Sequence, residues 1–150
     1  MTAPRRDVPS RAAWRTPQHE GTATLPRPTA GSVALVTGGG RGIGRRVAGA
    51  LAEDGMAVGL VARSGDELDE SVALIESAGG VAASAVADVT DDRALAGAVA
   101  RLRRALGPVD LLINNAGIMG PAGPAWEVGL DDWWRTMEIN LRGTLSCIRL

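Results

Sequence analysis

Five glycines lie within the eight residues 37–44, which read TGGGRGIG. A short β-branched apolar run, residues 32–37, precedes this stretch, and apolar residues at helical spacing follow it. A glycine-rich turn between a strand and a helix lets the backbone approach a ligand closely, and the helix N-terminus offers free N–H groups and partial positive charge. The stretch therefore predicts a binding site for a phosphate diester. The alternative is a glycine-rich turn that binds nothing.

The spacing of the glycines narrows the kind of phosphate group. A P-loop requires Lys followed by Ser or Thr after its last glycine, and the sequence contains no lysine. The common dinucleotide pattern G-x-G-x-x-G fits no frame of the stretch. The pattern that fits is T-G-x-x-x-G-x-G, through Thr37, Gly38, Gly42 and Gly44.

Polar residues that suit binding or catalysis occur at three further places. Asp88 follows the apolar run 81–87, and residues 114–117 (NNAG) follow the apolar run 109–113. Asn140 lies inside the last predicted helix, where asparagine is a mediocre helix former. The structural alternatives are that Asp88 caps a turn and that the asparagines at 114 and 115 bond to their own backbone in a turn.

These residues need a scaffold in which strands and helices alternate. Ser64 and Glu67 predict a capping box at the start of the second helix, and Asp91 or Asp92 predicts the cap of the third. The predicted strands are residues 32–37, 56–62, 81–87 and 109–113, and the predicted helices are residues 44–54, 64–78, 91–106 and 130–150. Such alternation predicts an α/β fold with a doubly wound parallel sheet, right-handed crossovers and helices on both faces.

The last predicted helix carries an apolar face with no obvious partner in the sequence. The residues of that face are Trp134, Met137, Leu141, Leu145 and Ile148. The strand over residues 109–113 is expected at an unprotected edge of the sheet. Exposed edges and large apolar patches favour aggregation, so we expect the chain alone to fold marginally.

In this order and on these elements, the motifs resemble the N-terminal half of the short-chain dehydrogenase/reductase family, which has a Rossmann fold. Residues 37–44 match the family's cofactor loop, and Asp88 with Val89 matches the residues that contact adenine. The cofactor-binding residues that follow from the resemblance and from the cofactor argument below are Thr37, Gly38, Gly40, Arg41, Gly42, Ile43, Gly44, Arg63, Asp88, Val89, Asn115, Ala116 and Gly117. The resemblance also implies that Asn140, in EINLRGT, belongs to the family's catalytic tetrad.

Two arginines favour NADP(H) as the cofactor over NAD(H). About twenty residues after the glycine loop, an NAD-preferring fold places an acid on the ribose 2′-hydroxyl. Ala62 takes that place here, and Arg63 follows it. A guanidinium binds a 2′-phosphate through paired, charge-assisted hydrogen bonds, whereas a carboxylate repels it. Arg41 lies where NADP-preferring relatives also carry a base; the alternative for Arg63 is a solvated charge at a strand end.

The resemblance implies hydride transfer between the cofactor and a small carbonyl/alcohol substrate, with 3-oxoacyl groups among the candidates. In the family a Tyr delivers the proton, a Lys lowers its pKa, a Ser binds the carbonyl oxygen and an Asn keeps a water relay in place. Only Asn140 matches one of these four positions. The sequence contains neither Tyr nor Lys, and Ser146 lies on the last predicted helix and is no substitute for the Ser. We therefore expect a fragment that lacks the catalytic Ser and Tyr-x-x-x-Lys and has no dehydrogenase activity of its own. The alternative is a non-catalytic nucleotide-binding module, or a subunit that another chain completes.

Composition argues against several other classes of function. The net charge of −1 gives no basis for binding nucleic acid or an anionic membrane, and no apolar run approaches the roughly 18 residues of a membrane span. The single cysteine, Cys147, excludes an internal disulfide and favours the cytoplasm. It is predicted to be a small buried apolar residue, and the one histidine lies far from it in the sequence, so no metal site is expected. Residues 1–30, rich in Pro and Arg, predict a flexible leader before an incomplete NAD(P)-binding Rossmann domain over residues 31–150. A full-length relative is expected to be a homo-oligomer.

Overall fold

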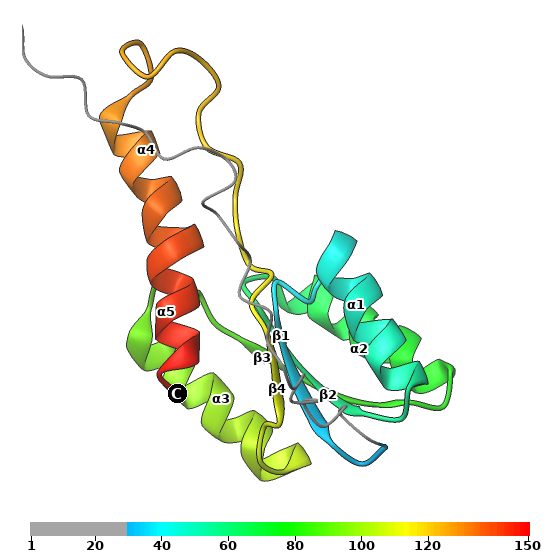
Figure 1. Ribbon diagram of the computed structural model, residues 1–150. Coiled ribbons are helices and arrows are strands. Elements are labelled where there is room, and N and C mark those ends of the chain that lie inside the picture. The colour runs from blue at the N-terminus through cyan, green and yellow to red at the C-terminus, as the bar shows by residue number, and fades with distance from the viewer. Residues whose placement is uncertain (1–29) are drawn as a thin grey trace, which may run out of the picture.

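The computed structural model describes residues 30–150, so the leader predicted over residues 1–30 lies outside the described residues except for Ala30. Four parallel strands form one sheet in the order β3-β2-β1-β4 (Figure 1). The strands are β1 (Val33–Thr37), β2 (Ala57–Ala62), β3 (Val81–Val86) and β4 (Leu111–Ile113). A helix connects each strand to the next, which confirms the predicted doubly wound parallel sheet.

Helices cover both faces of the sheet. Figure 1 shows α1 (Gly42–Glu53) and α2 (Gly65–Ser77) on one face and α3 (Asp92–Leu106) on the other. The sheet has one hydrophobic cluster on each face, and neighbouring residues of β1 belong to different clusters. Val36 packs with Ala48 of α1 and Leu68 of α2. Leu35 packs in the cluster that contains Leu95 of α3. Because successive side chains of a strand point to opposite faces, a strand covered on both sides is expected to be largely apolar, and in β1 only Thr37, at its end, is polar. All five residues of β1 are buried.

The strand β4 is shorter than the apolar run from which it was predicted. Val109 packs against the core on the α3 side, and the strand begins only at Leu111. Between them, Asp110 bonds to the start of β1: Val33 N donates to Asp110 Oδ2 at 2.8 Å, and Asp110 N donates to the Val33 carbonyl at 2.9 Å. A side-chain carboxylate therefore replaces regular strand pairing at this position.

The last helix of the chain is continuous but contains a π-helical segment. α4 (Leu130–Met137) continues through η2 (Glu138–Arg142) into α5 (Gly143–Ile148). A side chain at Gly143 would place its Cβ 2.6 Å from Cγ2 of Val89, so glycine permits the close approach of the helix to the loop after β3. Cys147 is buried on the same side, as predicted, and burial raises the pKa of its thiol.

Exposed polar contacts connect this helix to the start of α3. Arg142 Nη2 donates to Asp92 Oδ2 at 3.1 Å, and Arg142 Nη1 donates to Glu138 Oε1 at 2.7 Å. Ser146 Oγ donates to Asp92 Oδ1 at 2.7 Å, and this hydrogen bond makes the largest contribution to the lowered pKa of Asp92. Ion pairs this exposed contribute little to the free energy of unfolding.

The opposite side of the last helix is exposed, as the sequence predicts. Trp134, Leu141 and Leu145 are 59%, 67% and 54% exposed, and Ile148 lies on the same side. Met137 of the predicted face is half-buried. Among residues 30–150, no strand pairs with the outer side of β4, which is therefore the expected sheet edge. No helix in this part of the chain is long and apolar enough to cross a membrane.

We predict that the 150-residue chain self-associates through the exposed face of the last helix. Replacing Leu141 and Leu145 together by Glu should reduce the average mass measured by light scattering, because two charges would have to lose their hydration on contact. The matched control is Leu74→Glu on α2, where the leucine is 52% exposed but distant from this face. A monodisperse monomer with a sharp cooperative melt for the unaltered chain would contradict the prediction.

Candidate functional site

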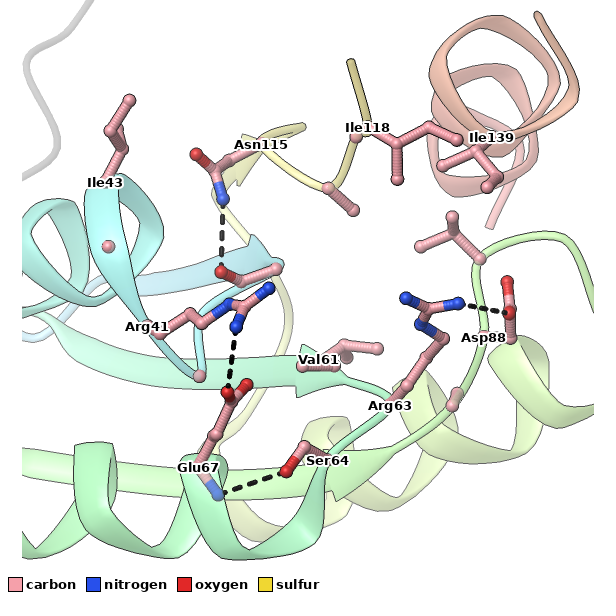
Figure 2. Close-up of a pocket in the computed structure, with 18 residues that line it drawn as sticks. Arg41, Ile43, Val61, Arg63, Ser64, Glu67, Asp88, Asn115, Ile118 and Ile139 are labelled. Atoms are coloured by element: carbon pink, nitrogen blue, oxygen red, sulfur yellow. Dashed lines mark hydrogen bonds and ion pairs between the residues drawn. The ribbon is translucent and has the colours of Figure 1, made fainter. Parts of the chain in front are cut away.

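A cavity of about 500 Å³ opens where the carboxyl ends of the four strands meet (Figure 2). The predicted ligand-binding residues that line it are Gly38, Gly40, Arg41, Gly42, Ile43, Arg63, Asp88, Val89, Asn115, Ala116 and Gly117. The chain runs from β1 to β2 and β3 on one side, whereas β4 pairs with the other side of β1. The cavity thus lies at the switch point of the strand order, where open α/β sheets bind their ligands.

Thr37 and Asn115 join the ends of β1 and β4 beneath the cavity. The Thr37 hydroxyl oxygen accepts from the backbone N–H groups of Asn115 and Ala116 at 3.1 and 3.0 Å. In return, Asn115 Nδ2 donates to the carbonyl oxygens of Thr37 and Gly38 at 2.9 and 3.1 Å. Thr37 does not line the cavity and is only 1% exposed, so its contacts in this structure support the glycine loop from below.

The first and last glycines of the T-G-x-x-x-G-x-G pattern are required by space. Gly38 has a φ of +65°, and a Cβ there would lie 2.8 Å from Asn115 Nδ2. A Cβ at Gly44 would overlap the carbonyl oxygen of Gly38 and would also meet Asn115 Nδ2 at 2.5 Å. The close approach of the helix to the end of β1 therefore needs glycine at both positions, and Gly44 itself is buried beneath the loop.

The N-terminus of α1 differs from those of the next two helices. Ser64 Oγ accepts from Glu67 N at the start of α2, and Asp91 caps α3, so Ser64 and Asp91 are the N-caps as predicted. The predicted capping box is only half formed, because the Glu67 carboxylate pairs with Arg41 and does not accept from the Ser64 N–H. In α1 no side chain caps the N-terminus and the first turn contains no acidic residue. Its free N–H groups begin at Gly42 and Ile43, which line the cavity, and they favour an anion there.

Two arginines face the same cavity, and each lies near a carboxylate (Figure 2). Arg41 Nη1 lies 3.4 Å from Glu67 Oε1, and Arg63 Nη1 lies 3.9 Å from Asp88 Oδ2. Asp88 Oδ1 also accepts from Thr90 N at 2.9 Å and from Thr90 Oγ1 at 2.8 Å. The Thr90 N–H in particular lowers the pKa of Asp88 from its usual value, against the opposing effect of burial. Asp88 therefore caps the turn and lines the cavity at once.

Asn140 lies beside the cavity and does not line it. Its side chain bonds twice to the backbone of Ile118: Oδ1 accepts from Ile118 N at 2.9 Å, and Nδ2 donates to the Ile118 carbonyl at 2.9 Å. Asn140 is also in the middle of η2, and π-helical turns inside α-helices are frequent at functional sites. The structure shows how Asn140 positions the segment after β4, and its catalytic role stays a prediction.

A network on the outer side of the loop escaped the sequence analysis. Arg45 Nε and Nη2 donate to the carbonyl oxygen of Gly40 at 3.0 and 2.5 Å, and the buried Ser71 Oγ donates to it at 2.9 Å. A trans peptide directs its C=O and N–H in opposite directions, so the N–H of Arg41 points away from these groups. Ser71 was detectable as the polar residue between Leu68 and Ile75 on the buried face of α2.

The fold and the site define a dinucleotide-binding α/β protein, since a parallel sheet carries a glycine-rich crossover and a cavity at its switch point. The family model for the short chain dehydrogenases matches residues 32–150. The chain therefore belongs to the short-chain dehydrogenase family, as its motifs predicted, and by family to the NAD(P)-dependent oxidoreductases.

Similar proteins are named dehydrogenases and reductases. The chain is 42% identical to the 2-dehydro-3-deoxy-L-rhamnonate dehydrogenase (NAD(+)) of Sphingomonas sp. (strain SKA58), over 80% of this chain and 47% of that protein. It resembles a 3-ketoacyl-ACP reductase from Sinorhizobium meliloti 1021 with a TM-score of 0.75 and 42% identity, over 79% of this chain and 46% of that one. It also resembles an actinorhodin polyketide ketoreductase with NADPH, with a TM-score of 0.75 and 34% identity, over 79% of this chain and 45% of that one. The chain spans somewhat less than half the length of each.

We predict that Gly44→Ala destabilises the fold, whereas Gly49→Ala in the same helix does not. The new methyl group at position 44 would force the loop away from Asn115, and overpacking of this kind costs about 1–3 kcal/mol. Position 49 has no atom within 4 Å of a Cβ, so alanine there should stabilise α1 by about 0.5–1 kcal/mol. Denaturant unfolding of both variants measures the difference. Equal free energies of unfolding would show that the loop does not need the close approach.

Proposed function

We propose that the described residues form the cofactor-binding part of an oxidoreductase that transfers hydride between NADP(H) and an alcohol/ketone pair. Family membership supports the reaction type. The observation that supports the choice of NADP(H) is that Arg41 and Arg63 line one cavity. At the end of β2 this cavity has Ala62, where an NAD-preferring fold has an acid that binds the ribose. Similar proteins carry both NAD(+) and NADPH in their names, so the argument for the phosphate rests on these side chains.

The residues of the cavity fit such a dinucleotide. Its volume of about 500 Å³ lies within the usual range of 300–1,000 Å³ for ligand pockets. The uncapped start of α1 would bind the diphosphate through N–H groups of Gly42 and Ile43. Arg41 and Arg63 would bind the 2′-phosphate, and Val89 would contact the adenine. The loop after β4, with Asn115, Ala116 and Gly117, would border the remaining part of the dinucleotide.

When bound, the nicotinamide supplies or accepts the hydride. In this proposal Asn140 fixes the backbone of Ile118, which lines the cavity, and so keeps the segment after β4 in place. Small ketones and 3-oxoacyl thioesters are the substrates to test first, because one similar structure is a 3-ketoacyl-ACP reductase. We further propose that the complete protein is a homo-oligomer, because the last helix has an exposed apolar face. We also propose that it is cytoplasmic, because its single cysteine is buried and forms no disulfide.

We predict that the chain binds NADP(H) more tightly than NAD(H). Both arginines are largely exposed, so the preference should lie near the lower end of what one charge-assisted contact gives, at about 10-fold in affinity. Calorimetric titration of both cofactors measures it. Ala62→Asp/Arg63→Ser should reverse the order, because a carboxylate then faces the 2′-phosphate.

The matched control for this titration is Arg101→Ser on α3, an exposed arginine that does not line the cavity. It removes one positive charge from the chain and should leave the ratio of the two affinities unchanged. Equal affinities of the unaltered chain for the two cofactors would refute the proposed preference.

We predict no NADPH oxidation by the purified 150-residue chain over a panel of ketones and 3-oxoacyl thioesters. The sequence contains no Tyr or Lys, and the amide of Asn140 is too weak an acid to deliver a proton. General acid–base catalysis contributes about 10²–10⁴-fold, and oxyanion stabilisation about 10²–10³-fold more. The expected result is a flat absorbance trace beside measurable NADPH binding. Turnover that disappears on Asn140→Ala would contradict it.

A further inference from the structure

Glu67 lines the cavity, although the sequence predicts only a capping role for it. It belongs to the first turn of α2, lines the cavity and forms an ion pair with Arg41 at 3.4 Å (Figure 2). Its carboxylate therefore enters the same cavity as the two arginines. Ala62 leaves the end of β2 without an acid, and Glu67 brings one to this cavity from the next helix.

Three backbone and packing contacts fix Glu67 in this place. Its N–H donates to Ser64 Oγ at 3.4 Å, and its carbonyl oxygen lies 2.9 Å from Ser71 Oγ, whose single proton it shares with the carbonyl oxygen of Gly40. A Cβ at Gly40 would lie 3.0 Å from Cβ of Glu67, so the glycine loop lies directly against the side-chain stem. The stem is therefore confined, and the carboxylate at its end lies 3.4 Å from Arg41 Nη1.

The pairing changes the charge that a ligand would meet. Arg41 is balanced by Glu67 and Arg63 by Asp88, so each cation has a carboxylate near it. A 2′-phosphate must compete with Glu67 for Arg41 and also approach a like charge. A ribose 2′-hydroxyl carries no charge and can donate a hydrogen bond to a carboxylate. The same glutamate therefore opposes one cofactor and suits the other.

We propose that Glu67 is a specificity-determining residue that lowers the preference of this site for a 2′-phosphorylated dinucleotide. The inference rests on the proposed function, since it assigns Glu67 a role in the binding of NADP(H) and NAD(H). Asp88 is less suited to this role, because its carboxylate also accepts two hydrogen bonds from Thr90 and its removal would disturb the turn after β3.

The test is titration of NADP⁺ and NAD⁺ into the full chain and into Glu67→Gln. The variant keeps every backbone contact of residue 67 and loses only the charge. We expect the affinity for NADP⁺ to rise about 5-fold, the effect of one exposed charge pair, and the affinity for NAD⁺ not to rise. Glu67→Ala is a second neutral variant and should behave in the same way; thermal melting of both checks the fold.

The matched control is Asp69→Asn, which removes the same charge from an exposed position of α2 that does not line the cavity. It should change neither affinity. Equal shifts for both cofactors, or equal effects of the substitutions at 67 and 69, would overturn the role of Glu67 while leaving the preference for NADP(H) intact. Binding of neither cofactor by the unaltered chain would overturn the proposed function and this inference together.

Discussion

The hydrogen bonds between Thr37 and the start of the Asn115 segment are the contact on which the whole site depends. One buried hydroxyl accepts from two backbone N–H groups, and one amide donates to two carbonyl oxygens. Leaving a buried backbone group without a partner costs about 1–3 kcal/mol, so the ends of β1 and β4 cannot separate cheaply. Because these ends are fixed, the glycine loop must cross a narrow space, and Gly38 and Gly44 are the residues that allow it.

The glycine loop is fastened on its outer side as well as from below. Arg45 and Ser71 bond to the carbonyl oxygen of Gly40, and the stem of Glu67 packs against the same residue. These contacts tie the loop to α2, whose first turn borders the cavity. Loop shape and cavity charge are consequently determined by one set of residues: the helix that stabilises the loop also supplies the carboxylate that balances Arg41.

The last helix is oriented by small and polar residues on its inner side. Gly143 admits Val89 closely, and Arg142 bonds to Asp92 at the start of α3. The helix then presents Asn140 to Ile118 on one side and Leu141 to solvent on the next. The same rotation therefore places a polar residue beside the cavity and an apolar face on the surface.

The sequence by itself determined the alternation of strands and helices, the glycine-rich loop between β1 and α1, and the apolar face of the last helix. These features depend on local periodicity, turn chemistry and glycine spacing, which neighbouring residues specify. Only the tertiary structure decided that β4 begins after Asp110, that the last helix contains a π-helical segment, and that Glu67 and Ser71 belong to the site. Each of these depends on a contact between segments distant in sequence, such as Asp110 with Val33 or Ser71 with Gly40. Glu67 lies three residues after the N-cap Ser64, and this spacing is the same whether its carboxylate caps the helix or pairs with an arginine of another loop. The packing of α2 against the glycine loop brings the carboxylate to Arg41, and that packing cannot be read from the local sequence.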